Sequence, residues 1–165
     1  MTVRFDLSEQ QSDIMDAVRQ LLARHAGLER VQALGGDSPS YDSDLEDALE
    51  KSGFADLGCG PDTTPLDAAL VAEAVAREVG VVAFGARTFV ATGLGAPDLA
   101  RPIAVTTAGH TGPVRYLGDA STLVVVDGDE AIAYTVEPNM STPVPSRFGY
   151  PFSRLTAPLP DGHSY

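Results

Sequence analysis

The chain has 165 residues, of which 44% are hydrophobic and 21% charged, the balance of a globular protein with one large domain or two small ones in close contact. Its 23 acidic and 11 basic residues give a formal net charge of −12, which argues against a nucleic-acid backbone or an anionic membrane as partner. No stretch approaches the roughly 18 apolar residues of a membrane span, and the N-terminus lacks the apolar core of a secretion signal. Cys59 is the only cysteine, so a structural thiol in a cytoplasmic protein is expected.

The first half of the chain predicts helices. Ser8 is a suitable N-cap and Gln11 completes a capping box, after which apolar residues recur at helical spacing. A short helical piece follows from Leu28. A further helix begins near Asp42 or Ser43 and ends at Gly53.

The next helix begins with Thr64 as cap and Pro65 in the first turn. It reads "PLDAALVAEAVAREVG" and is apolar almost all round, which predicts burial against several neighbours, with Leu70 as a core anchor. Glu73 within it is expected to pair with Arg77, four residues on; the alternative is a carboxylate with a perturbed pKa in a catalytic role. "VVAFGARTFVATGLG" predicts one more short helix.

The pattern changes at Pro97 to short β-branched runs, "PIAVTT", "PVRYL", "STLVVVD" and "EAIAYTV". Asp127 and Gly128 between the last two predict a hairpin. The following stretch is rich in proline and aromatics and suits edge strands and loops. We therefore expect a helical unit over residues 1–96 and a β-unit over residues 97–165.

The order of these elements resembles that of the acyl-CoA dehydrogenases. The resemblance is carried by "FDLSEQQSDIMDAVRQLLARHA", "LEDALEKSGFADLG" and "PLDAALVAEAVAREVGVVAFGARTFVA", and it covers the β-unit only loosely. It implies an α+β fold in which an N-terminal all-helical bundle is followed by a small antiparallel β-barrel or sandwich. The family's C-terminal four-helix domain is expected to be absent from this chain.

The resemblance also assigns a possible role to "AVTTAGHTG", residues 104–112. The family has here a turn reading Ala-Leu-Thr-Glu-Pro, then Gly and Gly-Ser-Asp, which contacts the flavin and the acyl-CoA. Ala104, Thr106 and Gly109 match it, so Thr106 and Gly109 are the implied cofactor-binding residues. The Glu-Pro pair, the Gly-Ser-Asp and the tryptophan that backs the flavin are missing. The alternative is that Thr106 ends a strand and Gly109 forms an ordinary turn.

No residue matches the family's catalytic glutamate, so the resemblance implies no catalytic residue in this chain. It implies FAD in the assembled enzyme, with none bound by this chain alone. The expected partner is a second acyl-CoA dehydrogenase-like chain or another copy of this one, and acyl-CoA is a possible ligand.

The family includes heteromeric enzymes that act on steroid side-chain CoA esters in actinobacteria, in which one subunit type has a degenerate flavin site. The expected function is therefore a subunit, or the N-terminal part, of a flavin-dependent acyl-CoA dehydrogenase that carries out α,β-desaturation in fatty-acid or steroid side-chain β-oxidation. The alternative is a non-catalytic acyl-CoA-binding or interaction module.

The remaining candidate residues give weaker signals. His25, His110 and His163 have no partners at metal-ligand spacing, so no metal site is expected. The aromatic stretch "SRFGYPFSRL", residues 146–155, would either line a groove for a nucleotide-bearing ligand or form an edge against which a partner packs.

Overall fold

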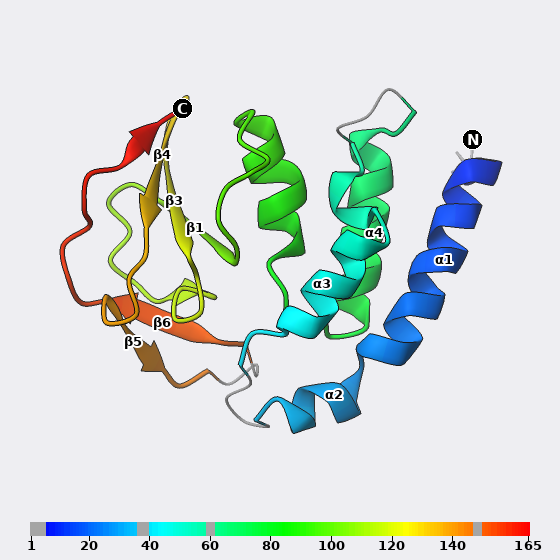
Figure 1. The fold of residues 1–165 in the computed structure, drawn as a ribbon, viewed down its shortest axis with the longest axis horizontal. Coiled ribbons are helices and arrows are strands. Elements are labelled where there is room, and N and C mark those ends of the chain that lie inside the picture. The colour runs from blue at the N-terminus through cyan, green and yellow to red at the C-terminus, as the bar shows by residue number, and fades with distance from the viewer. Residues whose placement is uncertain (1–5, 36–39, 59–61, 147–149) are drawn as a thin grey trace, which may run out of the picture.

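The structure is a computed structural model that describes residues 6–35, 40–58, 62–146 and 150–165. Cys59 and residues 147–149 of the aromatic stretch lie outside the described residues. Helices occupy one side of the molecule and strands the other (Figure 1). The helices are α1 (Glu9–His25), α2 (Leu28–Ala33), α3 (Ser43–Lys51), the 3₁₀-helix η1 (Phe54–Asp56), α4 (Pro65–Arg77) and the π-helix η2 (Ala86–Ala91). The strands are β1 (Ile103–Thr107), β2 (Val114–Arg115), β3 (Thr122–Asp127), β4 (Glu130–Thr135), β5 (Ser141–Val144), β6 (Phe152–Leu155) and β7 (His163–Ser164).

The N-termini of α1 and α4 are held together by their caps. The predicted capping box of α1 is confirmed: the Gln11 N–H donates to the Ser8 hydroxyl at 3.1 Å, and the Ser8 N–H donates to the Gln11 side chain at 3.0 Å. At the start of α4, Asp67 accepts from the Thr64 N–H at 2.7 Å. The Gln11 amide donates to the other Asp67 oxygen at 3.0 Å, which joins the two caps.

The core of the helical side is built from α1, α3, α4 and the segment after α4. Its fully buried side chains include Val18, Leu45, Leu49, Val71 and Val81. Leu70 is only partly buried, and Leu66, Ala69 and Ala76 on the same helix are exposed, so α4 presents one side to solvent. As expected, α4 packs against several neighbours, namely α1, η1 and η2. The expectation that Leu70 is its core anchor is wrong; Val71 and Val75 form its buried face.

Two sheets make up the β side, which confirms the predicted α+β class, in the form of a sandwich rather than a closed barrel. One sheet has the order β1-β3-β4-β7 and the other β2-β6-β5. The predicted hairpin joins β3 to β4, with Asp127 opposite Glu130 and Gly128 at φ 59°. The pair β1–β3 is parallel, so the first sheet is mixed and not antiparallel throughout as expected. The last helix ends at Ala91 and the first strand begins at Ile103. The division into two domains, residues 1–96 and 97–165, stays a prediction.

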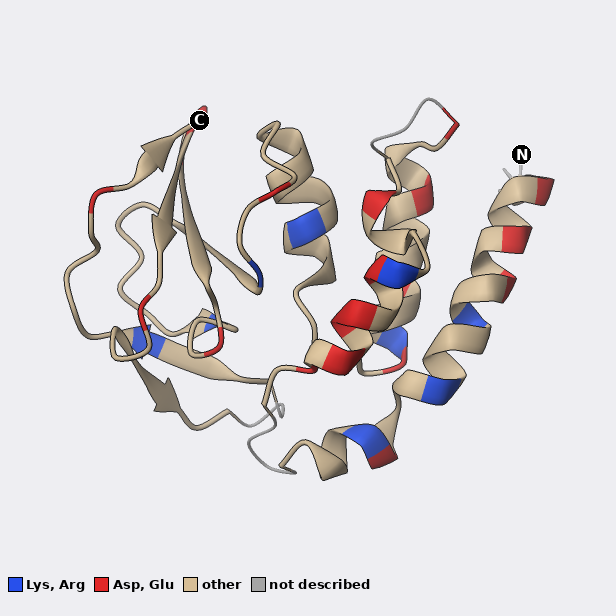
Figure 2. Ribbon diagram, viewed as in Figure 1, with Lys and Arg blue, Asp and Glu red and all other residues tan. Residues whose placement is uncertain are grey.

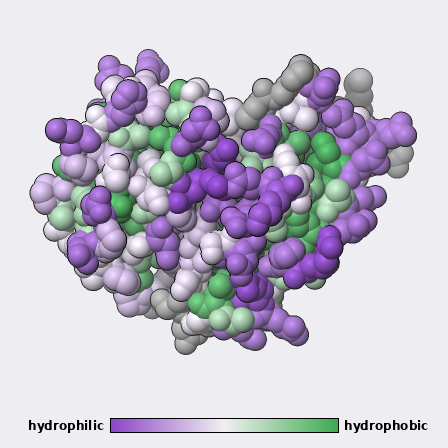
Figure 3. All heavy atoms as spheres, in the orientation of Figure 1, coloured by the Kyte–Doolittle hydropathy of each residue, from purple (hydrophilic) through white to green (hydrophobic). Residues whose placement is uncertain are grey.

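Contacts between side chains and backbone connect the two sides. The rings of Tyr41 and Tyr116 meet edge to face at 5.4 Å, and the Tyr41 hydroxyl accepts from the Ala83 N–H at 3.0 Å. An ion pair joins Arg101, before β1, to Glu50 on α3. Acidic and basic residues are interspersed along the helices and sparse on the strands (Figure 2). On the face shown in Figure 3, hydrophilic residues cover much of the helical side, with hydrophobic residues visible between them.

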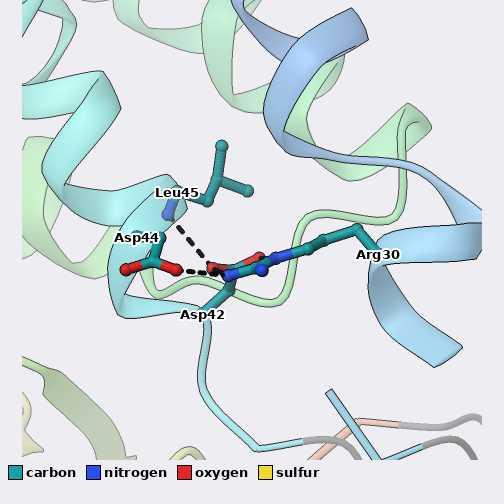
Figure 4. A network of polar contacts seen from close by, with 4 residues as sticks. All are labelled: Arg30, Asp42, Asp44 and Leu45. Carbon is teal, nitrogen blue, oxygen red and sulfur yellow. Dashed lines mark hydrogen bonds and ion pairs between the residues drawn. The ribbon is translucent and has the colours of Figure 1, made fainter. Parts of the chain in front are cut away.

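A second structural network fixes α2 against α3 (Figure 4). Arg30 donates to both oxygens of Asp42, at 2.8 and 2.6 Å, and to Asp44 at 2.9 Å. Asp42 is 1% exposed and also accepts from the Leu45 N–H at 3.1 Å, as the N-cap of α3.

Among the residues that the structure describes, no helix has both the length and the apolar character needed to cross a bilayer.

Candidate functional site

Strand β1 divides its side chains between the two faces of its sheet. Val105 packs with the cluster against η2, whereas Ala104 belongs to the cluster between the two sheets. Since side chains alternate along a strand, Thr106 lies on the same face as Ala104. It lines a cavity between the sheets where β1 ends.

The turn after β1 is tightly defined. The His110 N–H donates to the Thr107 carbonyl at 3.1 Å, and Gly109 stands in third position of this turn with φ +73°, a conformation that favours glycine. The His110 ring lies over Gly112, where an added Cβ would come within 2.9 Å of it. Glycine at 109 is thus explained by the turn itself, whether or not a ligand approaches.

The cavity has a volume of about 360 Å³. Its apolar lining comes from both sheets and from the C-terminal segment, and its polar lining comes mainly from the turn. No Asp or Glu lines it among the described residues. The lining consists of Thr106, Thr107, Gly109, His110, Thr111, Gly112, Val114, Leu117, Leu123, Val125, Arg154, Leu155 and Leu159.

Arg154 on β6 belongs to the stretch over residues 146–155 that the sequence offered as a groove lining, and it borders this cavity, but its side chain is exposed and lies on the opposite face of the strand from Leu155. The other described arginines and the lysine have ion pairs, hydrogen bonds or aromatic contacts, whereas none is found for Arg154 among the described residues. The sequence carried one signal for it, since Arg154 lies in a short strand-like run beside apolar residues. Only the pairing of β6 with β2 brings this run to the cavity.

A second cavity, of about 370 Å³, lies between the helical side and β1. Its lining is apolar, from residues such as Val82, Val90 and Val105, except where Arg115 and Tyr116 reach it. The Arg115 guanidinium lies 3.6 Å from the centre of the Tyr150 ring and donates to the Tyr116 hydroxyl at 2.7 Å. This fixes the orientation of Arg115 at the rim of the groove.

Tyr116 is the strained residue of this groove. It is buried and has φ +63°, which is rare for a residue with a bulky side chain. Burial raises the pKa of Tyr116 to about 12, against the opposing effect of Arg115, so the hydroxyl stays protonated at neutral pH. It acts as a fixed hydrogen-bond partner and not as a base.

The other candidate side chains do not gather into a site. His110 lies in the turn after β1, and His25 is the last residue of α1. The ring of His163 in β7 packs edge to face on that of Tyr165, with 4.8 Å between the ring centres. The described residues bring together no group of three metal-ligating side chains. Glu73 is exposed and forms the predicted ion pair with Arg77.

Glu46 on α3 is a further titratable group with an altered pKa beside a void. Burial raises its pKa, while a hydrogen bond with Tyr41 and the charge of Arg101 act in the opposite direction. The void beside it has a volume of about 10 Å³, which leaves room for a single water at most. This group is therefore part of the packing between α3 and the segment after α4.

The sequence matches no family model and no curated protein. Among solved structures, the fold is similar to that of a chain in the ChsE4-ChsE5 complex from Mycobacterium tuberculosis, with a TM-score of 0.59 and 14% sequence identity over 96% of the present chain. The present chain spans 57% of the length of that chain. At this identity the similarity shows a related fold.

Proposed function

We propose that this chain is a partner-dependent component of a flavin-dependent acyl-CoA dehydrogenase, which carries out α,β-desaturation of an acyl-CoA thioester in fatty-acid or steroid side-chain β-oxidation. One observation carries the proposal. The order of a helical bundle and then two sheets is similar, over 96% of the chain, to a chain from a complex of two components. The sequence resemblance to acyl-CoA dehydrogenases supplies the chemistry.

Desaturation needs a base for the α proton and a flavin as acceptor of the hydride from the β carbon. No carboxylate lines either of the two larger cavities among the described residues. The proposed base therefore comes from the partner. This chain would contribute one wall of the assembled site.

The residues at the β1 turn do not form a complete flavin site. Thr106 offers a hydroxyl and Gly109 a turn of the backbone, but among the described residues no Phe, Tyr or Trp lines this cavity as a surface on which a flavin ring would stack. We propose that Thr106 and Gly109 are at most peripheral contacts to FAD in the assembled enzyme. The partner would hold most of the cofactor.

A second function rests on the same cavities. Because no carboxylate is found among the described residues that line them, the chain is also suited to a non-catalytic role, as an acyl-CoA-binding or interaction module. The two functions differ in whether assembly with a partner produces turnover.

The test compares the purified chain with the chain co-purified with a full-length acyl-CoA dehydrogenase-like protein from the same organism. We expect the chain alone to be colourless and inactive on a panel of fatty and steroid side-chain acyl-CoAs with an artificial electron acceptor. Together the two should hold flavin and turn over. A stoichiometric flavin or robust turnover with the chain alone would contradict partner dependence. A stable complex without turnover, beside a partner that is active by itself, would favour the module.

A further inference from the structure

We infer that the cavity at the end of β1 is a binding site for a small uncharged aliphatic molecule that carries one hydroxyl group. The alkyl chain of this ligand lies between the two sheets, and its oxygen contacts the hydroxyl of Thr106. The inference goes beyond the proposed function and does not depend on it, because the cavity is formed within this chain.

The parallel pairing of β1 with β3 fixes the direction of the Thr106 side chain. Ala104 lies opposite Leu123 and Thr106 opposite Val125, and residues side by side on paired strands point to the same face of their sheet. Ala104, Leu123 and Val125 all belong to the cluster between the two sheets. Thr106 therefore points into the space between the sheets, which agrees with its place in the lining of the cavity.

The hydroxyl of Thr106 is available to a ligand. Thr106 is half-buried, and no hydrogen bond of its side chain is found among the described residues. A hydroxyl can donate one hydrogen bond and accept others, and covering it without a partner is costly. A ligand that fills the cavity therefore needs one oxygen at this position.

The rest of the lining sets the apolar part of the ligand. Leu117, Leu123, Val125, Leu155 and Leu159 contribute apolar surface from β3, β6 and the segments beside them. A volume of about 360 Å³ lies at the small end of ligand sites, roughly 300–1,000 Å³, and suits a short alkyl chain. Each methylene group that is removed from water strengthens binding roughly fourfold.

The distribution of charge around the cavity favours an uncharged ligand. No Asp, Glu or Lys is found among the described residues that line it. Arg154 borders the cavity with its side chain exposed on the other face of β6, and His110 is exposed in the turn after β1. A charged group between the sheets would have no buried counter-charge, and burial without one is costly.

The experiment is a titration of the full chain with 1-butanol, 1-pentanol and 1-hexanol, followed by the methyl NMR signals of leucine and valine. We expect saturable shifts of the Leu123, Val125 and Leu155 methyl groups, with an affinity that rises roughly fourfold for each added methylene. Sodium hexanoate has a chain of the same length and a charge. It should bind at least about tenfold more weakly than 1-hexanol, because the cavity offers its carboxylate no cation.

Two variants locate the ligand. Thr106→Val keeps the shape of the side chain and removes the hydroxyl, so it should weaken the binding of 1-hexanol about two- to tenfold. Thr135→Val, at an exposed residue of β4 outside the cavity lining, is the matched control and should leave the affinity unchanged. Val125→Phe fills the cavity from β3 and should abolish the saturable shifts of Leu123 and Leu155.

Four results would overturn the assignment. They are the absence of a saturable shift with the wild-type chain, shifts confined to Val82 and Val90 in the other groove, equal affinity for 1-hexanol and hexanoate, and unchanged binding by Val125→Phe. If Thr106→Val does not fold, the chain-length series, hexanoate and Val125→Phe still decide the question.

Discussion

At the scale of single residues, the loss of Arg30 would leave the buried carboxylate of Asp42 without its ion-pair partner. Asp42 is 1% exposed, and among the described residues its side chain keeps only the Leu45 N–H as hydrogen-bond partner when Arg30 is removed. We expect Arg30→Ala to lower the free energy of unfolding by about 1–3 kcal/mol, the cost of an under-satisfied buried acceptor. Urea titration measures this, with Arg24→Ala as control, for which a change within about 0.5 kcal/mol is expected. Equal small losses for both variants would mean that water replaces Arg30.

Asp67 makes a prediction about pH at the same scale. Burial alone would raise its pKa, but hydrogen bonds from the Thr64 backbone, Gln11 and the Thr64 hydroxyl prevail and lower it. A depressed pKa stabilises the fold above the ordinary aspartate range, near 3.9, and this stability is lost as the pH falls through the folded-state value. We therefore expect Asp67→Asn to destabilise at neutral pH and the difference from wild type to shrink below about pH 4.

Urea midpoints measured from neutral to acid pH test this prediction. Asp13→Asn, on the exposed side of α1, controls for the removal of one negative charge. A difference between wild type and Asp67→Asn that stays constant over the whole range would show that the joined caps do not depend on the charge of Asp67.

At the scale of elements, α4 is apolar on nearly all sides, but only one of its faces is buried. Val71 is 0% exposed, whereas Leu70 is partly buried. We expect Val71→Ala to cost about 1.5–3 kcal/mol, the value of a fully buried aliphatic side chain, and Leu70→Ala to cost less although it removes more atoms. Denaturant titration of both variants decides between them. A larger loss for Leu70→Ala would place the packed face of α4 on the other side.

The same scale shows how far the sequence predicts this fold. Local signals succeed: the Ser8–Gln11 box begins α1, Pro65 begins α4, and Asp127–Gly128 makes the β3–β4 hairpin. Contacts between distant segments were not predictable. Composition alone could not show which side of an apolar helix faces solvent, nor that β1 pairs in parallel with β3.

The candidate site divides in the same way. The turn of Thr106 and Gly109 was found from its residues, and the structure places both on one cavity. The stretch over residues 146–155 was considered as a groove lining, but its place beside that cavity depends on the pairing of β6 with β2, between residues almost forty positions apart. No local pattern records such a pairing.

At the scale of the whole molecule, large apolar side chains that are exposed to solvent predict association. Leu66 in the first turn of α4 is 57% exposed, Val79 just after this helix is 39% exposed, and Phe89 on η2 is 40% exposed. Exposed apolar surface of this kind marks interaction sites when it is contiguous. We expect sedimentation to show self-association that strengthens with salt, because the net charge of −12 repels at low ionic strength.

Phe89→Glu should weaken this association, and Leu28→Glu, at a residue 67% exposed on α2, is the matched control. A monomer at every concentration and salt, with no binding of a hydrophobic dye, would contradict the prediction for the isolated chain.

The position of β3 in its sheet has a consequence for how the molecule opens. β3 is hydrogen-bonded on both sides, to β1 in parallel and to β4 in antiparallel pairing, and Val124 in its middle is 0% exposed. Its amide protons can exchange with solvent only when one neighbouring strand separates, whereas β7 pairs on one side through two residues. Amide exchange should therefore be slowest in β3 and rapid in β7, so that the C-terminal strand detaches many times for each global unfolding event.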